Sequence, residues 1–135
     1  MKIKSTFLLL ILLKLTVGCH YNKANMTIRN ETDEIICYST LAKNFDNTYY
    51  EISAGGEIDS HNSDSPIIRG GADGLKTNID KYSDKSIYVA FYNPKEQQYV
   101  FKNLDSMLNT GKLKVMKFTK QELDKMNWKI IYKEK

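Results

Sequence analysis

The sequence has few of the side chains that build zinc sites and disulfide frameworks. Its 135 residues include two cysteines and two histidines. So few soft ligands argue against a zinc site. A calcium site is not expected either, because Asp59, Asp64 and Asp73 lie in polar segments without regular ligand spacing. We therefore expect no metal.

The chain also lacks a glycine loop of the kind that holds phosphate groups. Gly55-Gly56 and residues 70–74 have no lysine–serine or lysine–threonine ending and no strand-to-helix setting, so they predict turns. No recognisable nucleic-acid-binding motif is present. We expect neither a cofactor nor a nucleic-acid partner.

Catalytic groups are sparse as well. Cys37 lies in a strand-like segment, residues 34–39, where a buried and inert thiol is expected. A cysteine nucleophile needs a histidine base. The histidines are His20, near the N-terminus, and His61, in a polar segment, and neither placement predicts a dyad. We expect the chain not to be an enzyme.

The N-terminal residues, in contrast, form a recognisable pattern of charged, apolar and small residues. Lys2 and Lys4 precede the apolar run 7–13, and the small residue Gly18 precedes Cys19. This order predicts a secretory signal peptide. The apolar run is too short to span a bilayer, which takes about 20 apolar residues, and Lys14 interrupts it.

The end of this segment resembles the lipobox of bacterial lipoproteins, in which the cysteine after a small residue is acylated and becomes the new N-terminus. Thr16 stands where that motif usually has Leu, Val or Ile. The resemblance implies that residues 1–18 are removed and that palmitate-type acyl chains on Cys19 anchor the protein to a membrane. Cleavage by the general signal peptidase is the alternative. With Cys19 acylated, Cys37 has no internal disulfide partner.

The remaining chain predicts a tether at residues 19–25 and one β-rich domain at residues 26–135. Without the lysines of the signal its net charge falls to about +1. Residues 112–135 hold eight lysines and three acidic residues. These lysines alternate with apolar residues, which favours a solvated face over a site for anionic ligands.

Alternating apolar residues predict the strands. Residues 27–30 and 35–39 are expected to form a hairpin, and residues 48–52 a further strand. Residues 57–78 should be mainly loop around a short strand at 67–68. Residues 86–92 are apolar at both alternating sets, which predicts the centre of a sheet.

The C-terminal third is expected to alternate strands and short helical pieces. Residues 98–102 should pair with 86–92 as a hairpin, 103–109 should form a helical turn, and 112–118 should form an edge strand. Thr119 and Glu122 match a capping box that starts a helix at 120–126, and a last strand follows at 128–133. The predicted fold is mainly β: a single β-sandwich-like domain with one or two short helices near the C-terminus.

Residues 118–123 and 127–132 are similar to small uncharacterised lipoproteins of the Bacteroidetes, which often carry a threonine-capped helix, an asparagine–tryptophan dipeptide and a final strand. The resemblance implies a location in the cell membrane or outer membrane more than a chemistry. Residues 20–23 lack the acidic cluster typical of surface-exported members, which favours the periplasmic side. Asp105-Ser106-Met107 resembles the O-glycosylation site of that group, with Ser106 as the acceptor.

The function expected from these features is a lipid-anchored, non-catalytic binding or envelope-associated module with a protein partner. One form of it is an immunity protein that neutralises a toxin delivered to the periplasm. The alternative is a small periplasmic hydrolase with dispersed residues Asp64, His61 and Ser63. Tyr49, Tyr50 and Tyr99 would allow sugar stacking, but tyrosine is equally common in half-buried strands.

Overall fold

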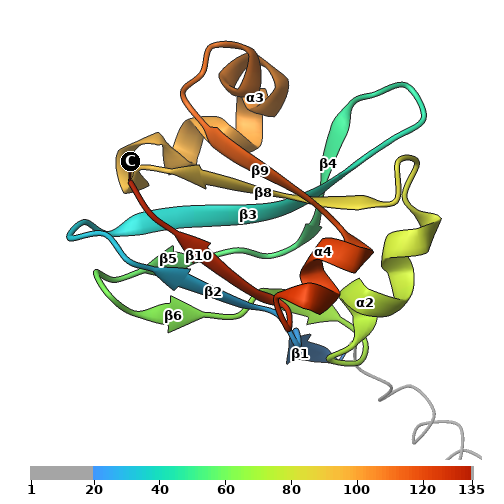
Figure 1. Ribbon diagram of the computed structural model, residues 1–135. Helices are drawn as coiled ribbons and strands as arrows, with labels where there is room; N and C mark the ends of the chain where they lie inside the picture. The colour runs from blue at the N-terminus through green and yellow to red at the C-terminus, as the bar shows by residue number, and fades with distance from the viewer. Residues whose placement is uncertain (1–19, 135) are drawn as a thin grey trace, which may run out of the picture.

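The computed structural model describes residues 20–134 (Figure 1), so the predicted signal peptide and Cys19 lie outside the described residues. The strands are β1 (Tyr21–Lys23), β2 (Thr27–Asn30), β3 (Ile36–Lys43), β4 (Tyr49–Ser53), β5 (Glu57–Ile58), β6 (Ser63–Asp64), β7 (Ile67–Arg69), β8 (Ser86–Tyr92), β9 (Lys114–Thr119) and β10 (Lys129–Tyr132). The helices are α2 (Gly74–Asn78), α3 (Gln97–Asn109) and α4 (Lys120–Lys125), with 3-10 turns at Ile79–Lys81 and Pro94–Glu96. None of these helices is both long and apolar enough to cross a membrane.

The central sheet is antiparallel, in the order β4-β3-β8-β9, and β5 also pairs with β3. Every residue of β8 is buried, which confirms the prediction that residues 86–92 form a central strand. At the edge of the sheet lies β9, as the alternation of lysine and apolar residues predicted. Alternation along β8 sends Ile87, Val89 and Phe91 to one face and Tyr88, Ala90 and Tyr92 to the other.

The second sheet has the order β10-β2-β6, with β10 parallel to β2 and β6 antiparallel to it. The predicted hairpin between residues 27–30 and 35–39 is therefore wrong. Buried Asn30 explains the change of layer: its amide nitrogen donates to the carbonyls of Glu34, Ile58 and Asp59. Its side-chain oxygen accepts from the backbone N–H and the hydroxyl of Thr32. This network turns the chain away from β2 before β3 begins.

Part of the expected tether belongs to the folded domain. Strand β1 pairs antiparallel with β7, and the N–H of Ala24 donates to the carbonyl of Pro66 at 2.8 Å. All three residues of β1 are exposed, so backbone hydrogen bonds hold the strand and no apolar pattern marks it in the sequence. Ala24 itself is buried.

Helix α3 replaces the strand predicted at residues 98–102, so that hairpin is wrong. Asn93 caps the preceding turn by accepting from the N–H of Lys95, and Pro94 follows at the start of the turn. Val100, Leu104 and Met107 recur at helical spacing and pack in one cluster against the sheet. The helical turn predicted at 103–109 is the second half of α3, beyond a kink at Asn103.

The capping box at the start of α4 is confirmed. The hydroxyl of Thr119 accepts from the N–H of Glu122, and the carboxylate of Glu122 accepts from the N–H of Thr119 at 2.7 Å. After α4, Asn127 and Trp128 both have positive φ, and the indole N–H of Trp128 donates to Asp124 at 2.8 Å. These turns lead into β10, which confirms the last predicted strand.

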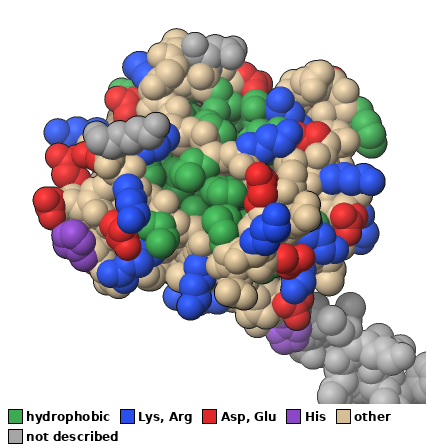
Figure 2. Space-filling model, in the orientation of Figure 1, with side chains coloured by type: hydrophobic (Ala, Val, Ile, Leu, Met, Phe, Trp, Pro, Cys, Tyr) green, Lys and Arg blue, Asp and Glu red, His purple; other side chains and the backbone are tan. Residues whose placement is uncertain are grey.

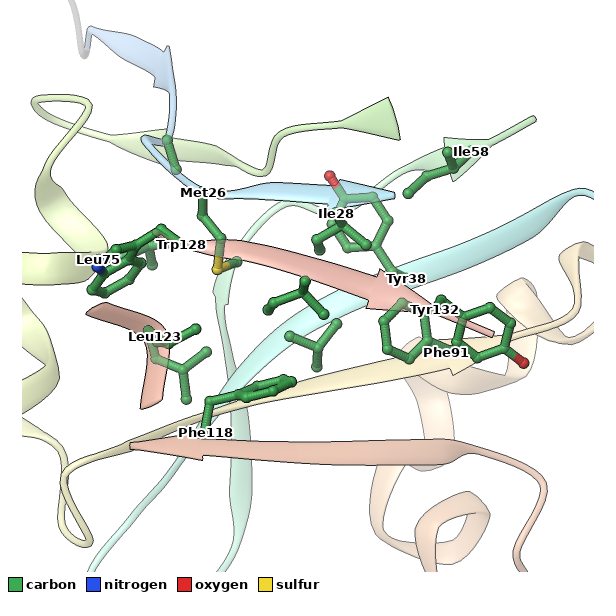
Figure 3. Packing of buried hydrophobic residues seen from close by; sticks show 14 of the residues in the cluster. Met26, Ile28, Tyr38, Ile58, Leu75, Phe91, Phe118, Leu123, Trp128 and Tyr132 are labelled. Atoms are coloured by element: carbon green, nitrogen blue, oxygen red, sulfur yellow. The ribbon is translucent and has the colours of Figure 1, made fainter. Parts of the chain in front are cut away.

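The fold is mainly β and sandwich-like, as predicted (Figure 1). Between the two sheets lies the larger core, which Figure 3 shows with Phe91 and Tyr132 side by side, their ring centroids 4.5 Å apart. The opposite face of the central sheet packs against α3 and forms a smaller cluster. Two hydrophobic clusters therefore share one sheet.

Candidate functional site

An apolar groove opens between β9, α4 and β10, with a volume of about 420 Å³. Figure 2 shows hydrophobic side chains gathered at the centre of this face. Ile131 is 45% exposed, and Met116 and Met126 are partly buried beside the core. The residues that line the groove are Met116, Phe118, Met126, Lys129, Ile130 and Ile131.

The groove exists because the sandwich is open along one side. In the described chain both β9 and β10 are edge strands, each paired on one side only. Edge strands present unpaired N–H and C=O groups. Beyond one end of the groove, the ammonium of Lys114 donates to the carbonyl of Lys133 and lies 4.5 Å from the ring centroid of Tyr132. At the other end α4 joins the two strands.

Lys129 lines the groove, and Lys114 in β9, Lys120 at the start of α4 and Lys133 just after β10 lie beside it. Lys120 pairs with Asp80 at 2.9 Å and Lys133 with Glu31 at 3.0 Å. Lys117 lies on the other face of β9, where it pairs with Asp84 at 3.1 Å and lies over the Tyr88 ring. Within residues 20–134, Lys114 and Lys129 form no ion pair. The segment 112–134 carries seven lysines and three acidic residues, and Asp80, Asp84 and Glu31 from outside the segment balance part of its positive charge.

A second hollow lies on the opposite face of the central sheet, beneath α3. It has a volume of about 260 Å³ and apolar walls from the sheet and the helix, with Ser39 and Glu51 among the lining residues. The hydroxyls of Ser39 and Tyr92 are 3.1 Å apart. The full lining is Ser39, Leu41, Tyr49, Tyr50, Glu51, Val100 and Leu104. We call this hollow the α3 cleft.

Charge in the α3 cleft is unbalanced. Glu51 is exposed, but partial desolvation still raises the pKa of its carboxyl, and the Ser39 hydroxyl offsets part of that rise. Burial also raises the pKa of Tyr92, with a contribution from the negative charge of Glu51. In the described part of the chain Glu51 forms no ion pair. The cleft thus combines apolar walls with a carboxylate that has no cation beside it.

The residues of the hydrolase alternative do not form one constellation. His61 Nε2 lies 2.8 Å from Asp33 Oδ1, and both side chains are well exposed. Asp64 instead accepts from the hydroxyl of Tyr38 at 2.9 Å and from the ammonium of Lys23 at 3.3 Å. No described hydrogen bond links Ser63 to His61, so a hydroxyl, a base and an orienting acid are not brought together.

The two remaining sequence candidates lie on different elements. Cys37 is fully buried in β3, and burial raises the pKa of its thiol to about 11, which keeps it protonated and unreactive at neutral pH. Ser106 is exposed on α3, where a modifying enzyme could reach it. In residues 20–134 the structure brings together no group of three or more metal-ligating side chains.

Sequence reasoning missed both hollows. The alternation of lysine with Met116 and Phe118 predicted an exposed strand, but no local signal shows that β10 lies across from it. The α3 cleft was hidden because residues 98–102 were predicted as a strand. A helical period through Val100, Leu104 and Met107 was the available signal.

No protein-family model, no curated protein and no solved structure matches this chain. The groove and the α3 cleft are therefore candidate sites because of their geometry alone.

Proposed function

We propose that the chain is a membrane-anchored lipoprotein, held by an acylated Cys19 and facing the periplasm, whose domain is a non-catalytic binding module for a protein partner. The observation that carries the proposal is the apolar groove between two unpaired strand edges. Apolar surface of this kind is costly to leave in water and marks interaction sites.

The occupant is an extended segment of the partner that carries acidic residues beside apolar ones. Strand edges can take a further strand through backbone hydrogen bonds, while side-chain pockets give specificity. The core-facing positions Met116, Phe118 and Ile130 provide such a pocket. Lys114 and Lys129 would attract the acidic residues, because complementary charge favours encounter and orientation.

The biological role proposed for this binding is immunity against a toxin delivered to the periplasm. An immunity protein acts by binding, so it needs an accessible surface and an anchor where the toxin arrives. The single small domain and the lipobox-like sequence meet these needs. Burial of a groove of about 420 Å³ would be one part of a larger interface.

The groove is tested by Ile131→Glu, with Ile67→Glu as the matched control. Their wild-type side chains are 45% and 44% exposed, but Ile67 lies outside the groove. The bait is the full-length protein, cross-linked in membranes. We expect the partner captured by wild type and by Ile67→Glu to be lost with Ile131→Glu. Capture by all three proteins would contradict a binding role for the groove.

The anchor and the immunity role have their own tests. Metabolic labelling with an alkyne fatty acid should label wild type and Cys37→Ser but not Cys19→Ser. Deleting the gene should make cells sensitive to a secreted toxin encoded next to it. Unchanged survival under attack would reject immunity while leaving the binding module standing.

A further inference from the structure

The α3 cleft is separate from the groove. Residues of β3 and β8 alternate between the faces of the central sheet, so Ser39, Leu41 and Tyr92 lie on the face that α3 covers. The second sheet and α4 lie on the other side (Figure 1). A ligand in the cleft would therefore not touch the proposed partner site.

The polar end of the cleft is acidic. Glu51 stands beside Leu41 in the β3–β4 register, and the hydroxyls of Ser39 and Tyr92 lie nearby. Glu51 is exposed, and it lines the cleft, where partial desolvation raises the pKa of its carboxyl. A carboxylate at the edge of an apolar hollow pairs well with a cation that donates hydrogen bonds. The group that would complete this end is a cation with hydrogen-bond donors.

The walls of the cleft favour a ligand whose non-polar part is aliphatic. Leu41, Val100 and Leu104 supply apolar surface from both the sheet and the helix. The volume of the cleft, about 260 Å³, lies below the usual range for pockets that bind drug-sized ligands, which implies a small ligand.

Aromatic rings complete the wall. The Tyr49 ring packs edge to face on Tyr88, with centroids 5.1 Å apart. The ammonium of Lys43 lies 4.9 Å from the Tyr49 centroid, so these rings already accept a cation. Among the ion pairs of residues 20–134 Lys43 does not pair with Glu51, so the carboxylate stays available to a second ammonium group.

We propose that the α3 cleft binds a primary alkylammonium group on a short aliphatic chain, with Glu51 pairing the ammonium and Leu41, Val100 and Leu104 contacting the chain. The ligand chemistry is shared by a free small amine and by the lysine side chain of a peptide. The hydroxyls of Ser39 and Tyr92 provide additional acceptors.

The experiment is an NMR titration of the folded protein with 1-aminopentane and, as the uncharged control, pentan-1-ol. We expect 1-aminopentane to shift the amide signals of β4 and α3 with a millimolar dissociation constant, and the alcohol to bind at least about tenfold more weakly. Glu51→Gln should lower the affinity for the amine by at least about tenfold, while Glu57→Gln, at an exposed position of β5, should not. A far-UV spectrum confirms that each variant is folded.

A parallel titration with Nα-acetyl-lysine N-methylamide distinguishes the two sources. Tighter binding of this compound assigns the cleft to a peptide lysine, and tighter binding of 1-aminopentane assigns it to a free amine. Equal binding of the amine and the alcohol, no shifts with either amine, or full affinity in Glu51→Gln would overturn the proposal.

Discussion

The two faces of the central sheet are built from the same strands but are covered differently. On one face Ile87, Val89 and Phe91 pack against a second sheet and two helices, and the Tyr38 hydroxyl and the Trp128 indole N–H of this cluster are hydrogen-bonded to carboxylates. On the other face Tyr88 and Tyr92 lie beneath one kinked helix, with a hollow beside them. The first face has the side chains of a stabilising core, and the second combines modest packing with polar groups.

This difference places close packing and open space on opposite faces of one sheet. Close packing across two layers excludes water and leaves little room for a ligand. A single covering helix leaves space, and Glu51, which forms no ion pair within residues 20–134, lines that space. The groove is an exception on the well-packed side, because it lies between β9 and β10, the edge strands of the two sheets.

The largest expected effect comes from Phe91→Ala, which removes a 1% exposed ring from the larger core. We expect a loss of about 3–5 kcal/mol in the free energy of unfolding, enough to unfold much of a marginally stable domain. Urea denaturation followed by tryptophan fluorescence measures it. Phe45→Ala, at a 92% exposed position, should change stability by less than about 0.5 kcal/mol. A small loss for Phe91→Ala would show that this face is not the main core.

A matched pair compares the two faces directly. Val89 is fully buried on the two-layer face, and Val100 is 2% exposed on the α3 face. We expect Val89→Ala to cost about 2–3 kcal/mol and Val100→Ala about 1 kcal/mol, because α3 can shift to fill the space and the strands cannot. Urea midpoints measure both. Equal losses in the free energy of unfolding would show that the two faces of the central sheet do not differ in packing.

Part of this arrangement could be predicted from the sequence because its signals are local. The apolar run of β8 and the capping box of α4 each depend on a few neighbouring residues. Helix α3 could not be recognised from Tyr99-Val100-Phe101, which looks like a strand on its own. Its helical period becomes visible only over thirteen residues and is interrupted by the kink at Asn103.

The sheet pairing and the groove depend on contacts between distant segments. Strand β2 lies beside β10 although Ile28 and Ile130 are far apart in the chain. No turn residue encodes a parallel pairing of this kind, because only a long connection can make it. The groove combines the edges of two sheets, so residues of β9 and β10 share no local pattern that would mark it.

Thr119→Ala tests whether the cap of α4 stabilises the two-layer face. Losing the capping hydroxyl should cost about 1 kcal/mol, because the Glu122 N–H loses its acceptor at the helix start. Thr119→Ser keeps the hydroxyl and is the control, with an expected cost well below that. Hydrogen exchange should show faster exchange in α4 alone. If exchange rises in α3 instead, the assignment of the two helices to separate faces is wrong.

The smallest expected effect belongs to Glu51→Gln. Partial burial raises the folded-state pKa of Glu51 above its usual 4.5, so the folded protein holds this proton more tightly than the unfolded chain. The stability from this group is fully present below pH 4.5 and is lost as pH rises through the folded pKa. Glutamine is always neutral and escapes the loss.

We therefore expect Glu51→Gln to match wild type at pH 3.5 and to exceed it at pH 7 by a few tenths of a kcal/mol, since solvent contact screens the carboxylate. Urea midpoints at the two pH values measure this difference. Glu57→Gln corrects for general charge effects. A variant less stable than wild type at pH 7 would mean that the carboxylate stabilises the α3 face. The contrast between a packed face and one that gives up stability to keep a charged group would then fail.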